Sequence, residues 1–263
     1  MQINNSRIVL TGAVGGMGSI LARALHAQGA RLALVDANAE ALEVLAKELD
    51  GTFAASGDLS SAAACKQVAD QCLALLDGVD MLINLAGVNS FTAFEDESPE
   101  KMELMMHVNL LAPMWLTRAF LPAMQQQNSG QLVNVGSIFG SIGFAYFTTY
   151  SASKFALRGF SEALRRELAD TAIKVSYIAP RAVKTPMNSD AVMRMGEATG
   201  MNMDEPEAVV AKIIEAIESD KKDAYFGFPE SLFVRVNALL PRVVDGALAA
   251  QNRIARAFAK GEK

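Results

Sequence analysis

Cysteine and histidine are scarce in this sequence. Only two of each occur among 263 residues. Cys65 and Cys72 stand seven residues apart in one helical pattern, which is too few and too close for a disulfide framework or a metal site. His26 and His107 are interpreted as packing or surface side chains, so no metal is expected. Two isolated thiols are typical of reduced packing cysteines in a cytoplasmic protein.

Positive charge and long apolar runs are lacking as well. The 24 Lys and Arg residues are outnumbered by 29 Asp and Glu residues, which gives a net charge of −5 and a pI near 5.2. A chain without a basic surplus is not expected to bind nucleic acid. No stretch approaches the roughly 20 apolar residues that cross a bilayer, and the polar start at 1–7 argues against a signal peptide. We therefore expect a soluble, cytoplasmic protein.

The sequence does contain a regular alternation of short apolar runs and helical patterns. Strands are predicted at Arg7–Thr11, Arg31–Val35, Thr52–Ala55, Met81–Leu85, Gln131–Val135, Val175–Ile178 and Ala224–Phe228. Helices are predicted at Met17–Gln28, Ala39–Leu49, Ala62–Leu76, Pro99–Gln127 and Tyr150–Leu168. This order requires parallel pairing, right-handed crossovers and helices on both faces. The predicted class is α/β, a single-domain doubly wound parallel sheet (Rossmann fold) of about seven strands.

In such a sheet, ligands bind at the carboxyl ends of the strands. The first predicted strand runs into TGAVGGMG, Thr11 to Gly18, before the first helix. Glycines at this place allow a tight turn, let the backbone approach a pyrophosphate, and leave the helix N-terminus free for negative charge. A flexible glycine loop is the alternative, and the strand-to-helix context favours dinucleotide binding over it.

Asp36 ends the second predicted strand, eighteen residues after Gly18. An acid at this distance accepts hydrogen bonds from both ribose hydroxyls and repels a 2′-phosphate. Neither Gly15 nor Ala37 offers a cation for such a phosphate, so NAD is favoured over NADP. An N-cap role for Asp36 is the structural alternative.

Tyr150 and Lys154 lie four residues apart in YSASK, at the start of a helical pattern and just after an aromatic run. Positions i and i+4 share one helix face, so the hydroxyl and the amine can approach one point. A cation within a few ångströms lowers a tyrosine pKa by roughly 1–3 units. The alternative is an ordinary amphipathic tyrosine beside a solvated lysine.

TGAVGGMG, NLAG (Asn84 to Gly87) and YSASK occur in a consistent order, and together they resemble the short-chain dehydrogenase/reductase family over about Ser6 to Phe228. NLAG has Leu85 where the family motif has a second asparagine. The resemblance implies a catalytic tetrad, with Ser137 thirteen residues before the tyrosine. Its members are Asn109, Ser137, Tyr150 and Lys154.

The resemblance implies a role for each tetrad residue. Tyr150 would be the general acid/base, while Lys154 would bind the nicotinamide ribose and lower the tyrosine pKa. Ser137 would hold the substrate oxygen, and Asn109 a water molecule. Residues expected at the cofactor are Thr11, Gly12, Gly16, Met17, Gly18, Asp36, Asp58, Leu59, Asn84, Ala86, Gly87, Tyr150, Lys154, Pro180, Val183 and Thr185.

The predicted function is therefore NAD(H)-dependent interconversion of a secondary alcohol and a ketone. A homodimer or homotetramer is expected, with the small-molecule substrate as the other partner. An NADP-preferring carbonyl reductase is one alternative. A regulatory protein that binds dinucleotide without turnover is the other, and the intact tetrad argues against it.

Two features after the sixth predicted strand bear on the substrate. Arg181 follows Pro180 where the family usually has glycine, and its partner cannot be read from the sequence. A substrate lid is expected around 185–204, within a Rossmann-fold domain at 1–228. The lid is rich in methionine, a flexible apolar residue that would fit a bulky apolar substrate such as a steroid, long-chain acyl or terpenoid ketone.

The remaining segment, 229–263, is predicted to be an amphipathic helical extension of the same domain. Six cations and three acids give it a net charge of +3 in a chain of −5. Basic charge beside an apolar face is typical of peripheral membrane contact, yet the same face could pack on the enzyme or on a second subunit. Packing is the favoured interpretation, and membrane contact is the alternative.

Overall fold

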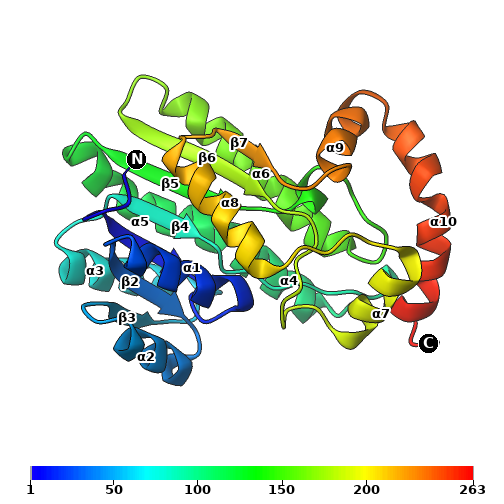
Figure 1. Cartoon of the computed structure of the whole chain (residues 1–263), viewed down its shortest axis with the longest axis horizontal. Helices are drawn as coiled ribbons and strands as arrows, with labels where there is room; N and C mark the ends of the chain where they lie inside the picture. The colour runs from blue at the N-terminus through cyan, green and yellow to red at the C-terminus, as the bar shows by residue number, and fades with distance from the viewer. Residues whose placement is uncertain (1, 263) are drawn as a thin grey trace.

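Seven parallel strands form one twisted sheet at the centre of the molecule (Figure 1). The computed structural model describes residues 2–262; Met1 and Lys263, which the predicted boundaries include, lie outside the described residues. The strands run in the order β3-β2-β1-β4-β5-β6-β7. They are β1 (Arg7–Thr11), β2 (Arg31–Asp36), β3 (Phe53–Ser56), β4 (Met81–Asn84), β5 (Gly130–Val135), β6 (Ile173–Ala179) and β7 (Asp223–Tyr225).

Helices cover both faces of this sheet, as the alternating pattern predicted. One apolar core joins the sheet to α1 (Gly16–Ala27), α2 (Ala39–Glu48) and α8 (Pro206–Glu218). The core on the opposite face includes α3 (Ala62–Leu76), α5 (Ala112–Gln126) and α6 (Thr148–Glu167). The interior strands are almost entirely buried, as parallel strands covered on both sides are. The predicted doubly wound α/β class is confirmed.

Two predicted elements differ in detail. The predicted helix at 99–127 is divided into α4 (Pro99–Met106), a π-helical segment η2 (His107–Leu111) and α5. The seventh strand is shorter than predicted, because the chain turns at Gly227, where φ is +94°. Short 3-10 helices η1 (Phe94–Asp96) and η3 (Ile138–Gly140) complete the loops beyond β4 and β5.

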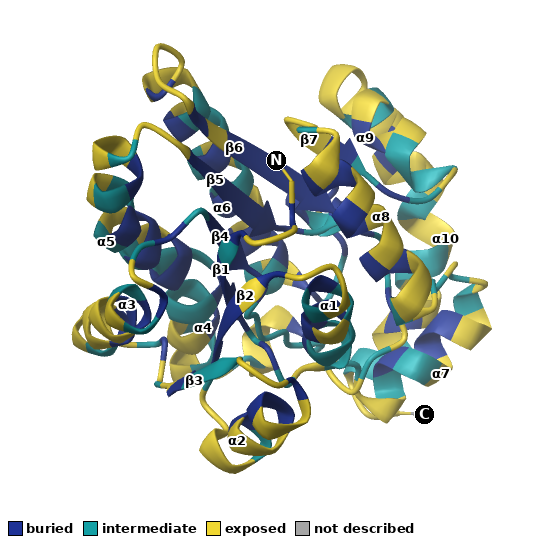
Figure 2. Ribbon diagram, turned by 60° about the vertical axis from the view of Figure 1, so that its left-hand side comes forward, coloured by how far each residue is buried: buried dark blue, intermediate teal, exposed yellow. Residues whose placement is uncertain are grey.

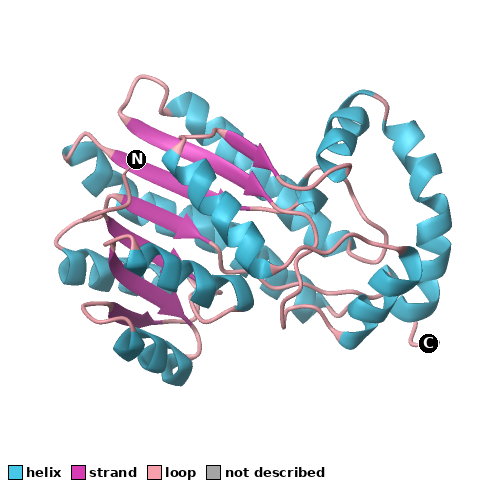
Figure 3. Cartoon of the chain, viewed as in Figure 1, coloured by secondary structure: helices cyan, strands magenta, loops and turns pink. Residues whose placement is uncertain are grey.

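The carboxyl ends of the strands face the side of the molecule where the last helices lie (Figure 3). α7 (Asp190–Thr199) follows β6 and lies within the predicted lid. α9 (Glu230–Leu239) and α10 (Pro241–Ala259) follow β7, and the far end of α10 lies against α7 (Figure 1). The C-terminal extension therefore returns to the carboxyl ends of the strands. None of the helices in residues 2–262 is both long enough and apolar enough to cross a membrane.

Candidate active site

The glycine loop after β1 is packed too closely for larger side chains. Gly12 has a φ of +69°, and a Cβ there would lie 2.7 Å from the Cα of Ala86. A Cβ on Gly18 would lie 1.9 Å from the carbonyl oxygen of Gly12. The α1 N-cap, Gly15, makes no side-chain capping bond, so the first amides of the helix face no competing acceptor there. The N-terminal amides of α1 are therefore available to an anion.

Thr11 closes the junction between β1 and β4. Its Oγ1 accepts hydrogen bonds from the amides of Leu85 and Ala86, each at 3.1 Å, and donates to the Ile83 carbonyl at 3.4 Å. The predicted cofactor residue Thr11 thus holds the NLAG backbone in place beside the glycine loop.

Asp36 lies at the end of β2 with its carboxylate turned to the loop. Oδ2 accepts from the Val14 amide at 3.2 Å and Oδ1 from the Asn38 amide at 3.1 Å. The N-cap of α2 is Asn38, which accepts from the Ala41 amide. The capping alternative for Asp36 is therefore wrong, and Asp36 lines the cavity described below.

Asp58 holds the turn after β3. Its two oxygens accept from the amide and the hydroxyl of Ser60, both at 2.9 Å. The backbone and side-chain hydrogen bonds from Ser60 lower the pKa of Asp58. Asp58 is thereby fixed as a carboxylate at the cavity wall.

Tyr150 and Lys154 are brought together on α6 as predicted, but the pKa shift of the tyrosine has the opposite sign. Lys154 Nζ lies 5.8 Å from the centroid of the Tyr150 ring and donates to the Val135 carbonyl at 3.1 Å. Burial raises the pKa of Tyr150 to about 12, and its hydrogen bond with Ser137 opposes that rise. Burial also lowers the pKa of Lys154 to about 8. Desolvation is the largest cause of the pKa shift of Tyr150, and the sequence alone could not show it.

Asn109 sits in the π-helical segment and is fully buried. Its Oδ1 accepts from the Val88 amide at 2.8 Å, and its Nδ2 donates to the Val88 carbonyl at 2.8 Å and the Ser153 hydroxyl at 3.0 Å. A Cβ on Gly87 would lie 3.3 Å from Asn109 Oδ1 and 3.6 Å from Lys154 Nζ. Gly87 lines the cavity, and Asn109 and Lys154 lie directly behind its backbone. Such π-bulges are frequent at functional sites.

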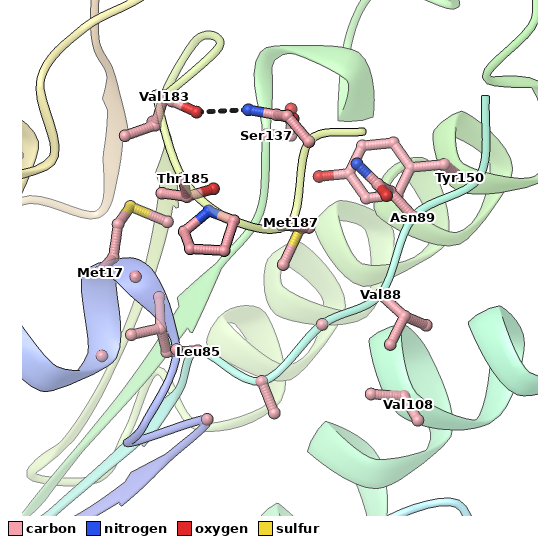
Figure 4. A pocket seen from close by; sticks show the side chains of 18 of the residues that line it. Met17, Leu85, Val88, Asn89, Val108, Ser137, Tyr150, Val183, Thr185 and Met187 are labelled. Atoms are coloured by element: carbon pink, nitrogen blue, oxygen red, sulfur yellow. Dashed lines mark hydrogen bonds between the residues drawn. The ribbon is translucent and has the colours of Figure 1, made fainter. Parts of the chain in front are cut away.

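Ser137 is the N-cap of η3, at the end of β5. Its Oγ accepts from the Phe139 amide at 3.1 Å. In Figure 4 the Tyr150 hydroxyl points toward the middle of the cavity, on the side where Ser137 lies. A phenol and an alcohol therefore converge on one point.

One cavity of about 710 Å³ joins these features. It is lined by most of the predicted site residues, namely Gly12, Gly16, Met17, Gly18, Asp36, Asp58, Leu59, Ala86, Gly87, Ser137, Tyr150, Pro180, Val183 and Thr185. The other predicted residues are buried outside the lining, namely Thr11, Asn84, Asn109 and Lys154. Asn84 donates to the side chain of Asn134 at 2.9 Å, which joins β4 to β5. Most of the predicted site residues thus lie at one cavity, and these four lie behind its wall.

The cavity also has walls that the sequence did not reveal. Val88 and Val108 line one side, across from Thr185 and Val183 (Figure 4). No local sequence pattern predicts Val108 at the cavity, because only the packing of the α4 region beside the strand ends places it there. Phe139 and Phe147 add aromatic surface near Tyr150, with ring centroids each 6.3 Å from its ring. The aromatic run before Tyr150 was the one available signal for Phe147.

Four of the five methionines of the predicted lid divide into two groups. Met187, Met201 and Met203 line the cavity. Met195 is fully buried outside the cavity lining, in an apolar cluster that also contains Val192 of α7 and Ala255 of α10. Some lid methionines therefore face the ligand space, while Met195 serves packing.

A glycine loop at a helix N-terminus, an acid at the end of β2 and a hydroxyl pair at the cavity define a dinucleotide-binding oxidoreductase. The model of the short chain dehydrogenase family matches residues 6–195, and the chain belongs to that family. The family's cofactor is a nicotinamide dinucleotide, and the cradle formed by Gly12, Gly18 and the uncapped start of α1 fits one.

Known proteins resemble the chain over most of its length. It is 35% identical, over 95% of its length and 82% of the relative, to dehydrogenase/reductase SDR family member 7B of Bos taurus. A short chain dehydrogenase/reductase from Burkholderia phymatum, solved with NAD, shares the fold at a TM-score of 0.83 and 22% identity, covering 93% of this chain and 96% of that one. A metagenomic short-chain oxidoreductase solved with NADP has a TM-score of 0.70 and 28% identity, covering 85% and 98%.

Proposed function

We propose that this protein is an NAD(H)-dependent enzyme that interconverts a secondary alcohol and a ketone. The observation that carries the proposal is the convergence of the Ser137 and Tyr150 hydroxyls at a cavity whose other end holds Asp36. The nicotinamide cofactor supplies the chemistry of hydride transfer at its ring. The protein residues bind the reactants and move the proton.

Tyr150 exchanges the proton with the substrate oxygen. With a pKa near 12 its phenol is protonated at neutral pH, which is the form that donates to a carbonyl oxygen during reduction. Oxidation of the alcohol needs the phenolate, and positive charge on Lys154 stabilises that form. Ser137 Oγ donates a hydrogen bond to the same substrate oxygen and fixes its distance from the phenol.

Lys154 and Asn109 support the tyrosine from behind the cavity wall. Lys154 is 4% exposed and held by the Val135 carbonyl, so its ammonium keeps a fixed place beside Tyr150. Asn109 fixes the chain after β4 through both of its amide atoms. We also propose that Lys154 binds the nicotinamide ribose and that Asn109 binds a water molecule.

The proposed preference for NAD rests on Asp36. Its carboxylate would accept hydrogen bonds from the ribose hydroxyls and would repel a 2′-phosphate. Two cations, Lys101 and Arg181, also line the cavity. Arg181 is engaged by two carboxylates, which leaves Lys101 as the cation that an NADP-preferring reductase would use. Titration of NADH and NADPH into the wild type and into Lys101→Met separates an NAD-dependent enzyme from an NADP-preferring reductase. If the wild type binds NADPH more tightly than NADH and Lys101→Met loses this preference, the NAD assignment is overturned.

The proposed substrate is bulky and apolar. Its end of the cavity is lined by Phe139, Phe147, Val192, Met201 and Met203, which offer apolar surface around the two hydroxyls. The test is NADH oxidation with a panel of apolar and polar ketones. Turnover restricted to short polar ketones would contradict the substrate class, and binding of NADH without any turnover would favour the regulatory alternative.

A further inference from the structure

Arg181 stands directly after Pro180, at the carboxyl end of β6, and all of its contacts lead away from that strand. Its Nε donates to Asp204 Oδ2 at 3.0 Å and its Nη2 to Asp204 Oδ1 at 2.6 Å. Its Nη1 donates to Glu230 Oε2 at 3.0 Å and to the Phe228 carbonyl at 3.2 Å. One guanidinium therefore joins the loop after β6, the end of the lid segment (185–204) and the start of α9. We call Arg181, Asp204 and Glu230 the Arg181 clamp.

Asp204 already ties the lid segment to the loop after β6 through the backbone. Its amide donates to the Ala182 carbonyl at 2.9 Å, and its carbonyl accepts from the Lys184 amide at 3.0 Å. The same loop carries Val183 and Thr185 to the cavity wall. The bidentate pair with Arg181 fixes this short parallel bridge at a geometry that an arginine fork matches and a lysine does not.

Glu230 forms the other half of the clamp. Its Oε1 accepts from the Asn202 side chain at 3.0 Å, so the acid reaches the lid segment as well as Arg181. Space for the arginine depends on Gly227, because a Cβ there would lie 2.5 Å from Arg181 Cδ. The side chains of the clamp are only partly exposed, at 18% for Arg181, 15% for Asp204 and 26% for Glu230. Partial burial makes such a network stronger than an exposed pair.

The C-terminal extension begins at this clamp and contacts the lid segment again at its far end. From Glu230 the chain runs through α9, where Asn237 donates to the Ser141 carbonyl at 2.8 Å, next to η3. α10 then returns to the lid segment, with Ala255 against Met195 and the Gln251 side chain donating to the Thr199 carbonyl at 3.5 Å. The extension therefore touches the lid segment at both of its ends.

We propose that Arg181 is a positioning residue that holds the lid segment and the C-terminal extension together as one wall of the substrate site. The hydrogen bonds of the guanidinium join three segments of the protein, so the role proposed for Arg181 is mechanical. Without the clamp, α7 and α10 would move together as a looser unit, while the cofactor cradle formed by β1, β2 and α1 would keep its geometry. The effect on substrate affinity rests on the proposed function; the effect on local opening does not.

The test compares Arg181→Met with a matched control, Arg165→Met. Arg165 also bridges two elements, pairing with Asp223 at 2.9 Å at the opposite end of β7. Hydrogen exchange of the intact protein, measured well below its Tm, should rise in residues 186–204 and 230–259 of Arg181→Met and stay unchanged in residues 7–36. Arg165→Met should show no rise in those two segments. Unchanged exchange in Arg181→Met, or an equal rise in the control, would overturn the clamp.

Two further readouts separate positioning from general stabilisation. Glu230→Gln should raise exchange mainly in 230–259, and the double variant Arg181→Met/Glu230→Gln should add little to Arg181→Met, because the two residues share one interaction. In turnover assays Arg181→Met should raise KM for the apolar ketone about tenfold with a smaller change in kcat. NADH affinity should change less than this KM, because none of the clamp hydrogen bonds named above reaches the glycine loop or Asp36. Additive effects, or a KM equal to that of the wild type, would refute the proposal. A wild type without turnover would count against the proposed function alone, since exchange decides the clamp.

Discussion

The cofactor half of the molecule and its C-terminal extension are built in different ways. Around β1, β2 and β4 the strand residues are mostly buried, and backbone groups and short side chains such as Thr11 fix the strand ends at hydrogen-bond distance. In α9 and α10 the buried residues are Val234, Val244 and Ala255, and most other positions are half-buried or exposed (Figure 2). The first region is part of the sheet core, and the second is attached to it.

This difference has a functional consequence. The cofactor site depends on backbone geometry, which side-chain substitutions outside the glycines change little. The substrate wall depends on a few long side-chain contacts, which single substitutions can loosen without unfolding the sheet. We therefore expect changes in the cofactor half to affect cofactor binding and chemistry, and changes in the extension to affect substrate selection.

The largest expected effect is at the proton-transfer residue. Tyr150→Phe should lower kcat by about 10²–10⁴, because it removes the transferable proton, while NADH affinity stays near that of the wild type. Steady-state kinetics and NADH fluorescence titration provide the measurement. Tyr146→Phe, in the same aromatic run, is the matched control and should retain activity. More than about a tenth of wild-type kcat in Tyr150→Phe would refute the catalytic assignment.

Removal of the C-terminal extension tests most directly whether the extension serves the substrate site and not the cofactor site. A chain ending before Pro229 should keep NADH binding but lose turnover of apolar ketones by about tenfold or more, since the wall opens. It should also be less soluble, because Val192 and Met195 lose their cover. Retained activity and oligomeric mass together with lost binding to anionic liposomes would instead identify the extension as a membrane contact. Exposed Leu239, Leu240 and Val243 make that control necessary.

Asp36 should set cofactor choice without affecting the extension. Asp36→Ala should reduce the ratio of NADPH to NADH dissociation constants about tenfold, equivalent to roughly 1.4 kcal/mol. Glu40→Ala, in the first turn of the adjacent α2, is the control and should leave the ratio unchanged. An unaltered ratio in Asp36→Ala would place cofactor selection elsewhere.

The smallest effect concerns the pH dependence of stability. The pKa of Lys154 is lowered by burial to about 8 from 10.5, so between these values the unfolded chain binds more protons than the native one. The cost of burying the ammonium is present below pH 8 and is lost as the pH rises. The free energy of unfolding of the wild type should therefore rise relative to Lys154→Met from pH 8 to 10. Urea titrations at each pH measure the difference in free energy of unfolding between the two proteins. Tyr150→Phe is the control, and its free energy of unfolding should still rise relative to Lys154→Met from pH 8 to 10.

The sequence predicted the cofactor half well because its signals are local. Gly12 and Gly18 are required within one turn, Asp36 ends a strand, and Tyr150 and Lys154 share a helix face at i and i+4. Alternating runs of apolar residues also predicted the sheet and its two helical layers. These features follow from backbone geometry over a few residues, so the chain itself specifies them.

Tertiary structure alone decided features that depend on distant residues or on burial. Burial raises the pKa of Tyr150, an effect that the spacing to Lys154 does not contain. The helical pattern at 99–127 does not reveal the π-helical segment that carries Asn109. Arg181 meets Asp204 and Glu230 only because the strand order brings β6 and β7 side by side and returns the lid to their ends. Local periodicity fixes which face a residue occupies, while chain crossovers and desolvation fix its partners and its charge.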